Sequence, residues 1–168
     1  MLLGGLSQQY RTLYETAIET AKNHLFFRPM TPQEEDILIS GGVRVLSPNE
    51  VELDPQGQHL ACFVGGMMGI GARVFERPED LAIAQKLVNG CIWAYQSMPS
   101  GIMPETFHVV PCQNSTSCEW DEKKWHAGIA SRNKDFKTGY PESVAGQINK
   151  LGLLPGFTDI PDRRYILR

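Results

Sequence analysis

Two apolar segments joined by a very short connection constrain this chain more than any other feature of its sequence. Residues 59–75 are apolar on nearly every side, and residues 79–98 follow after a connection at residues 76–77. Such a connection predicts two antiparallel helices that pack against each other. Cys62 lies 14 residues before the connection begins and Cys91 lies 14 residues after it ends, so the two cysteines are level in the pair. Level cysteines on facing sides reach the Cα separation of about 4.4–6.8 Å that a disulfide needs, and we predict this bond.

The remaining chain predicts further helices and one small sheet. Residues 7–28 repeat apolar side chains at the i, i+3, i+4 spacing of a buried helix face. Two β-branched runs on either side of a glycine pair predict a β-hairpin within residues 37–46. Loop is expected for residues 105–119, followed by short helices near residues 120–130 and 141–152. The expected fold class is therefore mainly α, with a small β-hairpin.

Charge and hydropathy exclude several classes of function. The 168-residue chain has a net charge of −3 with both signs interspersed, and nucleic-acid binders instead carry clustered basic faces. No apolar run approaches the roughly 18 residues of a membrane span, so no span is expected in this segment. The start of the chain lacks the basic region and apolar core of a signal peptide. These features alone favour the cytosol.

The four cysteines and one asparagine favour the secretory pathway instead. An even cysteine count fits two disulfides, and by proximity we pair Cys112 with Cys118. Between them, Asn114-Ser115-Thr116 is an N-glycosylation acceptor. Reduced buried thiols and a chance triplet are the alternative, but an acceptor inside a short cysteine loop is typical of an oxidising compartment. Because a lumenal protein needs a signal and this chain shows none, we expect the chain to be a piece of a longer protein whose N-terminus lies outside this sequence.

Glu105 is the carboxylate whose surroundings are most unusual. Gly101 and Pro104 precede it, in a segment that proline and glycine exclude from a regular helix. A lone acid on a loop is usually solvated, and these residues by themselves favour that interpretation.

Other polar and aromatic residues are expected to be structural. No His/Cys spacing fits a zinc site. Three histidines without a partner pattern are assigned to structure or surface: His24, His108 and His126. Three aromatic side chains are expected in the core rather than as ligand-binding platforms: Phe63, Trp93 and Tyr95. Phe107 fits either role, and the acidic residues at 119–122 are expected to be a solvated face.

Several motifs, taken in order, resemble class I α-1,2-mannosidases, glycoside hydrolase family forty-seven. They are the His-Leu-Ala-Cys-Phe run at 59–63, Cys91, the Ser-Gly-Ile-Met-Pro-Glu run at 100–105, and the terminal segments 1–6 and 163–168. The resemblance extends along essentially the whole chain and is greatest to the secreted fungal members.

This resemblance implies an (α/α)7 barrel of antiparallel helical hairpins that is plugged at one end by a β-hairpin. It also implies hydrolysis, with inversion, of terminal α-1,2-linked mannose from high-mannose N-glycans, and a calcium ion, Ca2+, at the barrel floor. By position, His59 matches a histidine near the sugar subsite and Glu105 matches the loop carboxylate of the active-site cavity. Arg168 matches an arginine that contacts the mannose. The cysteines that match Cys62 and Cys91 are disulfide-bonded in the family.

The resemblance further implies that residues 1–168 are an internal segment of one catalytic barrel domain, without its N-terminal and C-terminal hairpins. About two or three of the seven hairpins are represented. An inverting glycosidase needs two carboxyl groups about 6.5–9.5 Å apart, and the family's acid, base and calcium-binding threonine match none of the segments present. We therefore expect no certain catalytic residue and no metal ligand in this chain, and no mannosidase activity from it alone.

A segment taken from a barrel also exposes helix faces that the full barrel buries, so residues 61–72 are expected to be partly bare. The complete protein is expected to be a monomer in the lumen of the ER or Golgi, or secreted. The alternative functions are a non-catalytic, mannose-binding quality-control relative, whose class generally lacks the Cys62–Cys91 bridge, and an inactive fragment.

Overall fold

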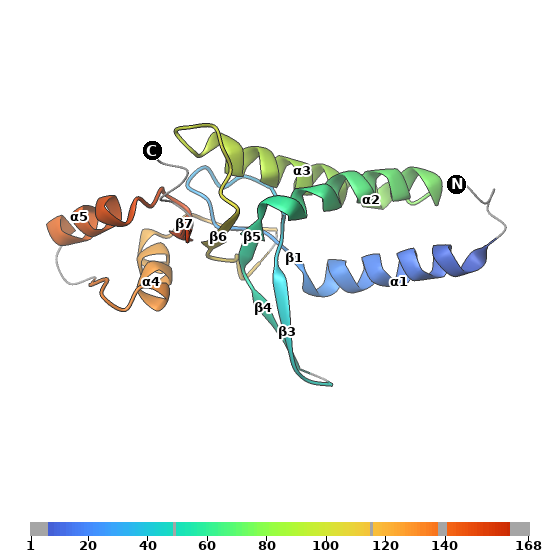
Figure 1. Ribbon diagram of the computed structural model, residues 1–168, viewed down its shortest axis with the longest axis horizontal. Helices are drawn as coiled ribbons and strands as arrows, with labels where there is room; N and C mark the ends of the chain where they lie inside the picture. The colour runs from blue at the N-terminus through green and yellow to red at the C-terminus, as the bar shows by residue number, and fades with distance from the viewer. Residues whose placement is uncertain (1–6, 49, 115, 138–140, 162–168) are drawn as a thin grey trace.

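The computed structural model describes residues 7–48, 50–114, 116–137 and 141–161 (Figure 1). Its α-helices are α1 (Gln8–His24), α2 (Phe63–Val74), α3 (Pro78–Gln96), α4 (Glu122–Arg132) and α5 (Pro141–Leu151), and a 3-10 turn, η1 (His59–Cys62), leads into α2. Helices α1, α2 and α3 lie together at one end of the molecule, and α4 and α5 lie at the other, with the strands between them (Figure 1). Within the described ranges, no helix combines the length and hydropathy of a membrane span.

The strands form three small antiparallel sheets. β1 (Phe26–Phe27) pairs with β2 (Ile39–Ser40), and β3 (Gly42–Ser47) pairs with β4 (Glu50–Asp54). The third sheet has the order β5 (Gln56–Gln58), β6 (Thr106–Val109), β7 (Phe157–Asp159). The described residues are therefore a mixture of helices and small sheets, rather than helices with a single hairpin.

The helical pair predicted from sequence is present as α2 and α3. Pro78 occupies the first turn of α3, followed by two acidic residues that complement the helix dipole. Cys62 and Cys91 form a disulfide with a Cα separation of 5.8 Å, as their level positions predict. A side chain at Gly65 would place its Cβ 2.9 Å from Val88, so the glycine allows the two helices to approach closely.

The hairpin predicted around the glycine pair is wrong. Gly41 and Gly42 lie where the chain passes from one sheet to the next, because β2 pairs with β1 and β3 pairs with β4. A Cβ at Gly41 would lie 2.8 Å from the backbone oxygen of Asp54. This glycine therefore marks a close approach between chain segments rather than a turn.

The loop predicted after Glu105 is wrong for residues 106–109, which form β6, the central strand of the three-stranded sheet, and is confirmed for the described residues from 110 to 119. Phe107 on this strand is 1% exposed. It packs edge-on against Phe157, whose ring in turn stacks on Trp93 at 4.8 Å. Phe107 and Trp93 therefore belong to the core, which continues into α4 and α5.

Helix α1 is held against the corner between α2 and α3 by buried charge. Asp80, in the first turn of α3, is fully buried and accepts a hydrogen bond of 2.7 Å from Nε of Arg77. Lys22 of α1 forms an ion pair with the same carboxylate, and Arg77 reaches back to Glu19 of α1. The predicted apolar stripe of α1 contributes less, since Ile18 is its only buried residue among those described.

One face of η1 and α2 is bare in the described structure. It carries five large apolar side chains at a spacing of three and four residues, each between 37% and 81% exposed: Leu60, Phe63, Met67, Ile70 and Val74. The expected place of Phe63 in the core is wrong, because its side chain is 76% exposed. Partial exposure of residues 61–72 is confirmed.

Candidate active site

Two of the three residues that resemblance assigns to sugar lie side by side. The backbone N–H of His59 donates a 2.9 Å hydrogen bond to the carbonyl of Glu105. Nδ1 of the same histidine lies 4.0 Å from Oε1 of the Glu105 carboxylate. The cause is local: Gln58 of β5 is opposite Thr106 of β6, so the residues just beyond these strand ends become neighbours.

Tyr95 is a third member of this cluster, and the expectation from sequence that it lies in the core is wrong. Its hydroxyl lies 2.7 Å from Nε2 of His59, and the two rings pack edge-on with centroids 6.0 Å apart. Tyr95 is 37% exposed. One signal was available in the sequence: Tyr95 is one helical turn beyond Cys91, which the disulfide fixes beside the η1 turn that begins at His59.

The loop before Glu105 has the shape that its glycine and proline predict. Gly101 adopts a left-handed φ of +68°, a conformation that glycine takes without steric cost. Its N–H donates to the carbonyl of Met98 at 2.9 Å, and Pro104 is fully buried. These anchors place Glu105 directly before β6, between the buried Pro104 and the first residue of the strand.

The cluster faces solvent in the described part of the chain. The side chain of His59 is 40% exposed and that of Glu105 is 72% exposed. Arg168, the third residue assigned to sugar, lies outside the described residues. The structure thus brings together His59 and Glu105 and adds Tyr95 to them, and this surface offers a carboxylate, an imidazole and a phenol to a polar ligand.

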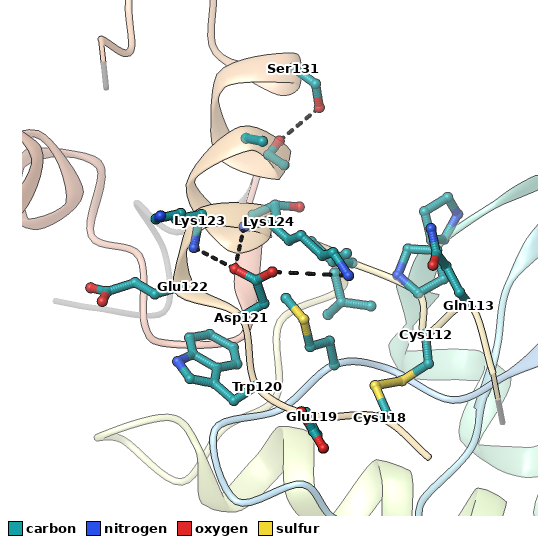
Figure 2. A pocket seen from close by; sticks show the side chains of 18 of the residues that line it. Cys112, Gln113, Cys118, Glu119, Trp120, Asp121, Glu122, Lys123, Lys124 and Ser131 are labelled. Atoms are coloured by element: carbon teal, nitrogen blue, oxygen red, sulfur yellow. Dashed lines mark hydrogen bonds and ion pairs between the residues drawn. A yellow bond between two sulfur atoms is a disulfide. The ribbon is translucent and has the colours of Figure 1, made fainter. Parts of the chain in front are cut away.

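A separate, broad hollow of about 1080 Å³ lies beside the second disulfide (Figure 2). Cys112 and Cys118 form this bond with a Cα separation of 5.6 Å, the pair expected from their proximity. Between them Asn114 is exposed, and its side-chain oxygen accepts hydrogen bonds from the backbone N–H and the hydroxyl of Thr116, at 2.9 and 2.7 Å. The glycosylation acceptor therefore lies on the wall of the hollow.

The acidic residues of 119–122 form another part of that wall, and one of them has a specific structural task. Asp121 caps α4 by accepting hydrogen bonds from the backbone N–H groups of Lys123 and Lys124, at 2.9 and 3.1 Å (Figure 2). Glu119 and Glu122 are exposed, as expected of a solvated face. Helix capping explains Asp121 without a ligand.

His108 occupies a buried polar cluster between the sheets. It is 6% exposed, and its ring nitrogens lie 3.8 Å from carboxylate oxygens of Asp54 and Asp159. Burial lowers the pKa of His108 below its usual range, and the charge of Arg132 lowers it further, against the opposing effect of the two aspartates. Its role is structural, as the sequence analysis expects.

The described ranges contain no group of three or more histidine, cysteine, aspartate or glutamate residues arranged to hold a metal ion. The described residues therefore do not fit a calcium site.

A family model described as glycosyl hydrolase family 47 matches residues 1–168. The probable mannosyl-oligosaccharide alpha-1,2-mannosidase 1B of Neosartorya fischeri is 31% identical over 127 residues, which are 76% of this chain and 21% of that protein. The mannosyl-oligosaccharide alpha-1,2-mannosidase 1B of Emericella nidulans is 33% identical over 102 residues, 61% of this chain and 19% of that protein.

A third relative, the mannosyl-oligosaccharide alpha-1,2-mannosidase of Penicillium citrinum, is 27% identical over 152 residues, 89% of this chain and 25% of that protein. Among solved structures, an alpha-1,2-mannosidase from Trichoderma reesei matches with a TM-score of 0.47 and 25% identity, over 55% of this chain and 18% of that one. The chain spans about a fifth to a quarter of the length of these curated relatives.

Proposed function

We propose that this chain, which belongs to glycosyl hydrolase family 47, is part of an enzyme that hydrolyses terminal α-1,2-linked mannose from high-mannose N-glycans. The observation that carries the proposal is the contact between His59 and Glu105, two residues from separate segments that the family resemblance assigns to the sugar site. The names of the relatives, all mannosyl-oligosaccharide alpha-1,2-mannosidases, support the same substrate.

Residues 1–168 are, in this proposal, an internal segment of one (α/α)7 barrel. The antiparallel pair of α2 and α3 supports this, because such hairpins are the repeating unit of the barrel. The bare apolar face of η1 and α2 supports it as well, because large apolar patches on soluble proteins mark surfaces that another element covers. The share of about a fifth of the relatives' length fits a few hairpins out of seven.

Glu105 has the clearest chemical role in the proposal. A carboxylate accepts charge-assisted hydrogen bonds from sugar hydroxyls, which are shorter and stronger than bonds between neutral groups. Arg168 donates to the same sugar. The general acid and base of an inverting mechanism, about 6.5–9.5 Å apart, come from hairpins other than those described. The calcium ion that the family resemblance implies would be held by residues outside the described ranges.

The proposed compartment is the lumen of the ER or Golgi, or the medium after secretion, with the complete protein a monomer. Two disulfides support an oxidising compartment. Exposure of Asn114, between the cysteines of the second disulfide, supports its use as a glycosylation site. Mass spectrometry of the purified protein before and after enzymatic deglycosylation tests the site, and Asn114→Gln is expected to abolish the mass shift.

The decisive experiment uses the full-length protein that carries this chain, incubated with a high-mannose N-glycan. Released mannose is quantified, and NMR of the first product identifies its anomer, which is β if the enzyme inverts. We expect Glu105→Gln to lower kcat/KM at least tenfold, whereas Glu79→Gln, an exposed glutamate on α3, leaves it unchanged. The 168 residues alone are expected to release no mannose.

Two outcomes count against the proposal. Glycan binding without mannose release by the full-length protein supports the non-catalytic mannose-binding relative instead. Equal activity of Glu105→Gln and the wild type would show that Glu105 is not part of the sugar site. The contact between His59 and Glu105 would then no longer support the proposal.

A further inference from the structure

We propose that Tyr95 is a positioning residue that orients Glu105 through His59. The proposal rests on the proposed function, because it concerns the same carboxylate. Three side chains from three elements carry it: the end of α3, the first residue of η1, and the residue just before β6. The hydroxyl of Tyr95 lies 2.7 Å from Nε2 of His59, and Nδ1 of that ring faces the Glu105 carboxylate at 4.0 Å.

The two contacts select one form of the imidazole. A neutral histidine has a donor at one ring nitrogen and an acceptor at the other. With the proton on Nδ1, the N–H of His59 points toward the negative Glu105, and Nε2 accepts the O–H of Tyr95. The opposite tautomer turns a lone pair toward a carboxylate, which is electrostatically unfavourable. The hydrogen bond at one nitrogen thus decides which nitrogen carries the proton, as it does for other functional histidines.

The backbone holds the three groups in register. The N–H of His59 donates to the carbonyl of Glu105 at 2.9 Å, so the two residues cannot separate without breaking a main-chain hydrogen bond. The Cys62–Cys91 disulfide joins η1 to α3 close to both ring partners. The edge-on contact of the rings, at 74°, further restricts rotation of the imidazole.

The relay restricts the orientation of the exposed Glu105 carboxylate before a ligand binds. Glu105 is 72% exposed, and an exposed side chain must lose rotamer entropy when it binds a ligand. A fixed N–H at His59 Nδ1 favours one carboxylate orientation, either directly or through one water across the 4.0 Å separation. Both ring nitrogens are then engaged, so His59 acts as an orienting group and not as a general base.

Steady-state kinetics of the full-length protein on a high-mannose N-glycan test the relay. The loss of one net hydrogen bond corresponds to roughly a 2- to 13-fold effect. We expect Tyr95→Phe to raise KM about fivefold and to leave kcat within a factor of about two, because Glu105 binds sugar equally in the ground and transition states. Tyr10→Phe, which removes a hydroxyl from a 63% exposed tyrosine on α1, is the matched control and leaves both constants unchanged.

A double-mutant cycle separates positioning from a merely structural role. If Tyr95 acts through Glu105, adding Tyr95→Phe to Glu105→Gln changes KM no further. If the two effects multiply instead, the residues are independent and the relay is wrong. An unchanged KM in the single Tyr95→Phe variant also overturns it.

NMR of the ¹⁵N-labelled histidine rings tests the relay without any activity measurement. We expect the Nδ1–H tautomer at His59 in the wild type and a mixture of tautomers in Tyr95→Phe. An Nε2–H tautomer in the wild type overturns the relay. If NMR finds the expected tautomers but the protein releases no mannose, the relay is retained and the proposed function is refuted. Failure of the relay and failure of the proposed function are therefore distinguishable.

Discussion

Replacing Asp80 by asparagine is expected to destabilise the protein far more than replacing Glu79, the other acid in the first turn of α3, by glutamine. Asp80 is fully buried between Arg77 and Lys22. Removing one partner of a buried ion pair costs about 3–5 kcal/mol, because the other charge is left unpaired. The side chains of Arg77 and Lys22 keep 18% and 16% exposure, so water partly solvates them and we expect about 3 kcal/mol.

Glu79→Gln is the matched control for this variant. Glu79 and Asp80 both lie in the first turn of α3, so each substitution removes one acid from the helix N-terminus, worth about 0.5 kcal/mol. The Glu79 carboxylate is 62% exposed and 3.9 Å from Arg77, so it contributes little more than this. Urea unfolding of the full-length variants at pH 7 measures the difference. Equal losses in the two variants would refute the argument for a buried ion pair.

Acid provides a second test of the same carboxyl group. Burial raises the pKa of Asp80, but hydrogen bonds from Arg77 and Lys22 lower it by more, so the pKa lies below its usual range. The stabilisation is therefore complete above the unfolded value of about 3.9 and is lost as the pH falls through the folded value. We expect wild type and Asp80→Asn to converge in stability below about pH 4. A difference that persists undiminished to pH 2 contradicts this sign.

Three further changes have calculable outcomes, each measured by urea unfolding. Replacing Cys62 and Cys91 by serine is expected to cost about 3.6 kcal/mol and replacing the shorter disulfide about 2.2, from loop entropies for separations of 29 and 6 residues; the reverse order contradicts the entropic account. Gly90→Ala is expected to lower the free energy of unfolding by about 1–3 kcal/mol, since its Cβ would lie 2.0 Å from the backbone oxygen of residue 38. Gly146→Ala meets open space on its helix and is expected to raise the free energy of unfolding by up to ~1 kcal/mol. Equal effects of the two variants would argue against the close packing at Gly90. Because the pKa of His108 is lowered in the folded protein, the free energy of unfolding is expected to fall as the pH drops below about 6.5. His108→Gln is expected to reduce this pH dependence. If the pH dependence is unchanged in the variant, another group causes it.

The helical part of the fold was predictable because its signals are local. The apolar run of residues 59–75 and the short connection after it predicted α2 and α3. The level positions of Cys62 and Cys91 predicted their disulfide, since antiparallel arms rise equally per residue. The strands were not predictable in the same way. β6 pairs with β5 and β7, which lie about 50 residues away on either side, and no local pattern identifies such distant partners.

The candidate site was predictable by motif but not by geometry. The runs around His59 and Glu105 identify both residues by resemblance, whereas their contact depends on the pairing of β5 with β6. Tyr95 was missed because an aromatic residue on an apolar helix usually indicates core packing. Its hydrogen bond to His59 emerges only when the disulfide brings α3 beside η1.

The order of strands in the third sheet also sets the time at which the sheet beside this site can be completed during synthesis. β7 ends at Asp159, 54 residues after Glu105, and β6 has no partner on that side until β7 has been made. At about 5–20 residues per second, translation takes about 3–11 s to cover this distance. Cys62 and Cys91 are both synthesised before that interval begins. Oxidation of the helical pair can therefore precede completion of the sheet, so that the covalent link beside His59 and Tyr95 exists before β6 is paired on both sides.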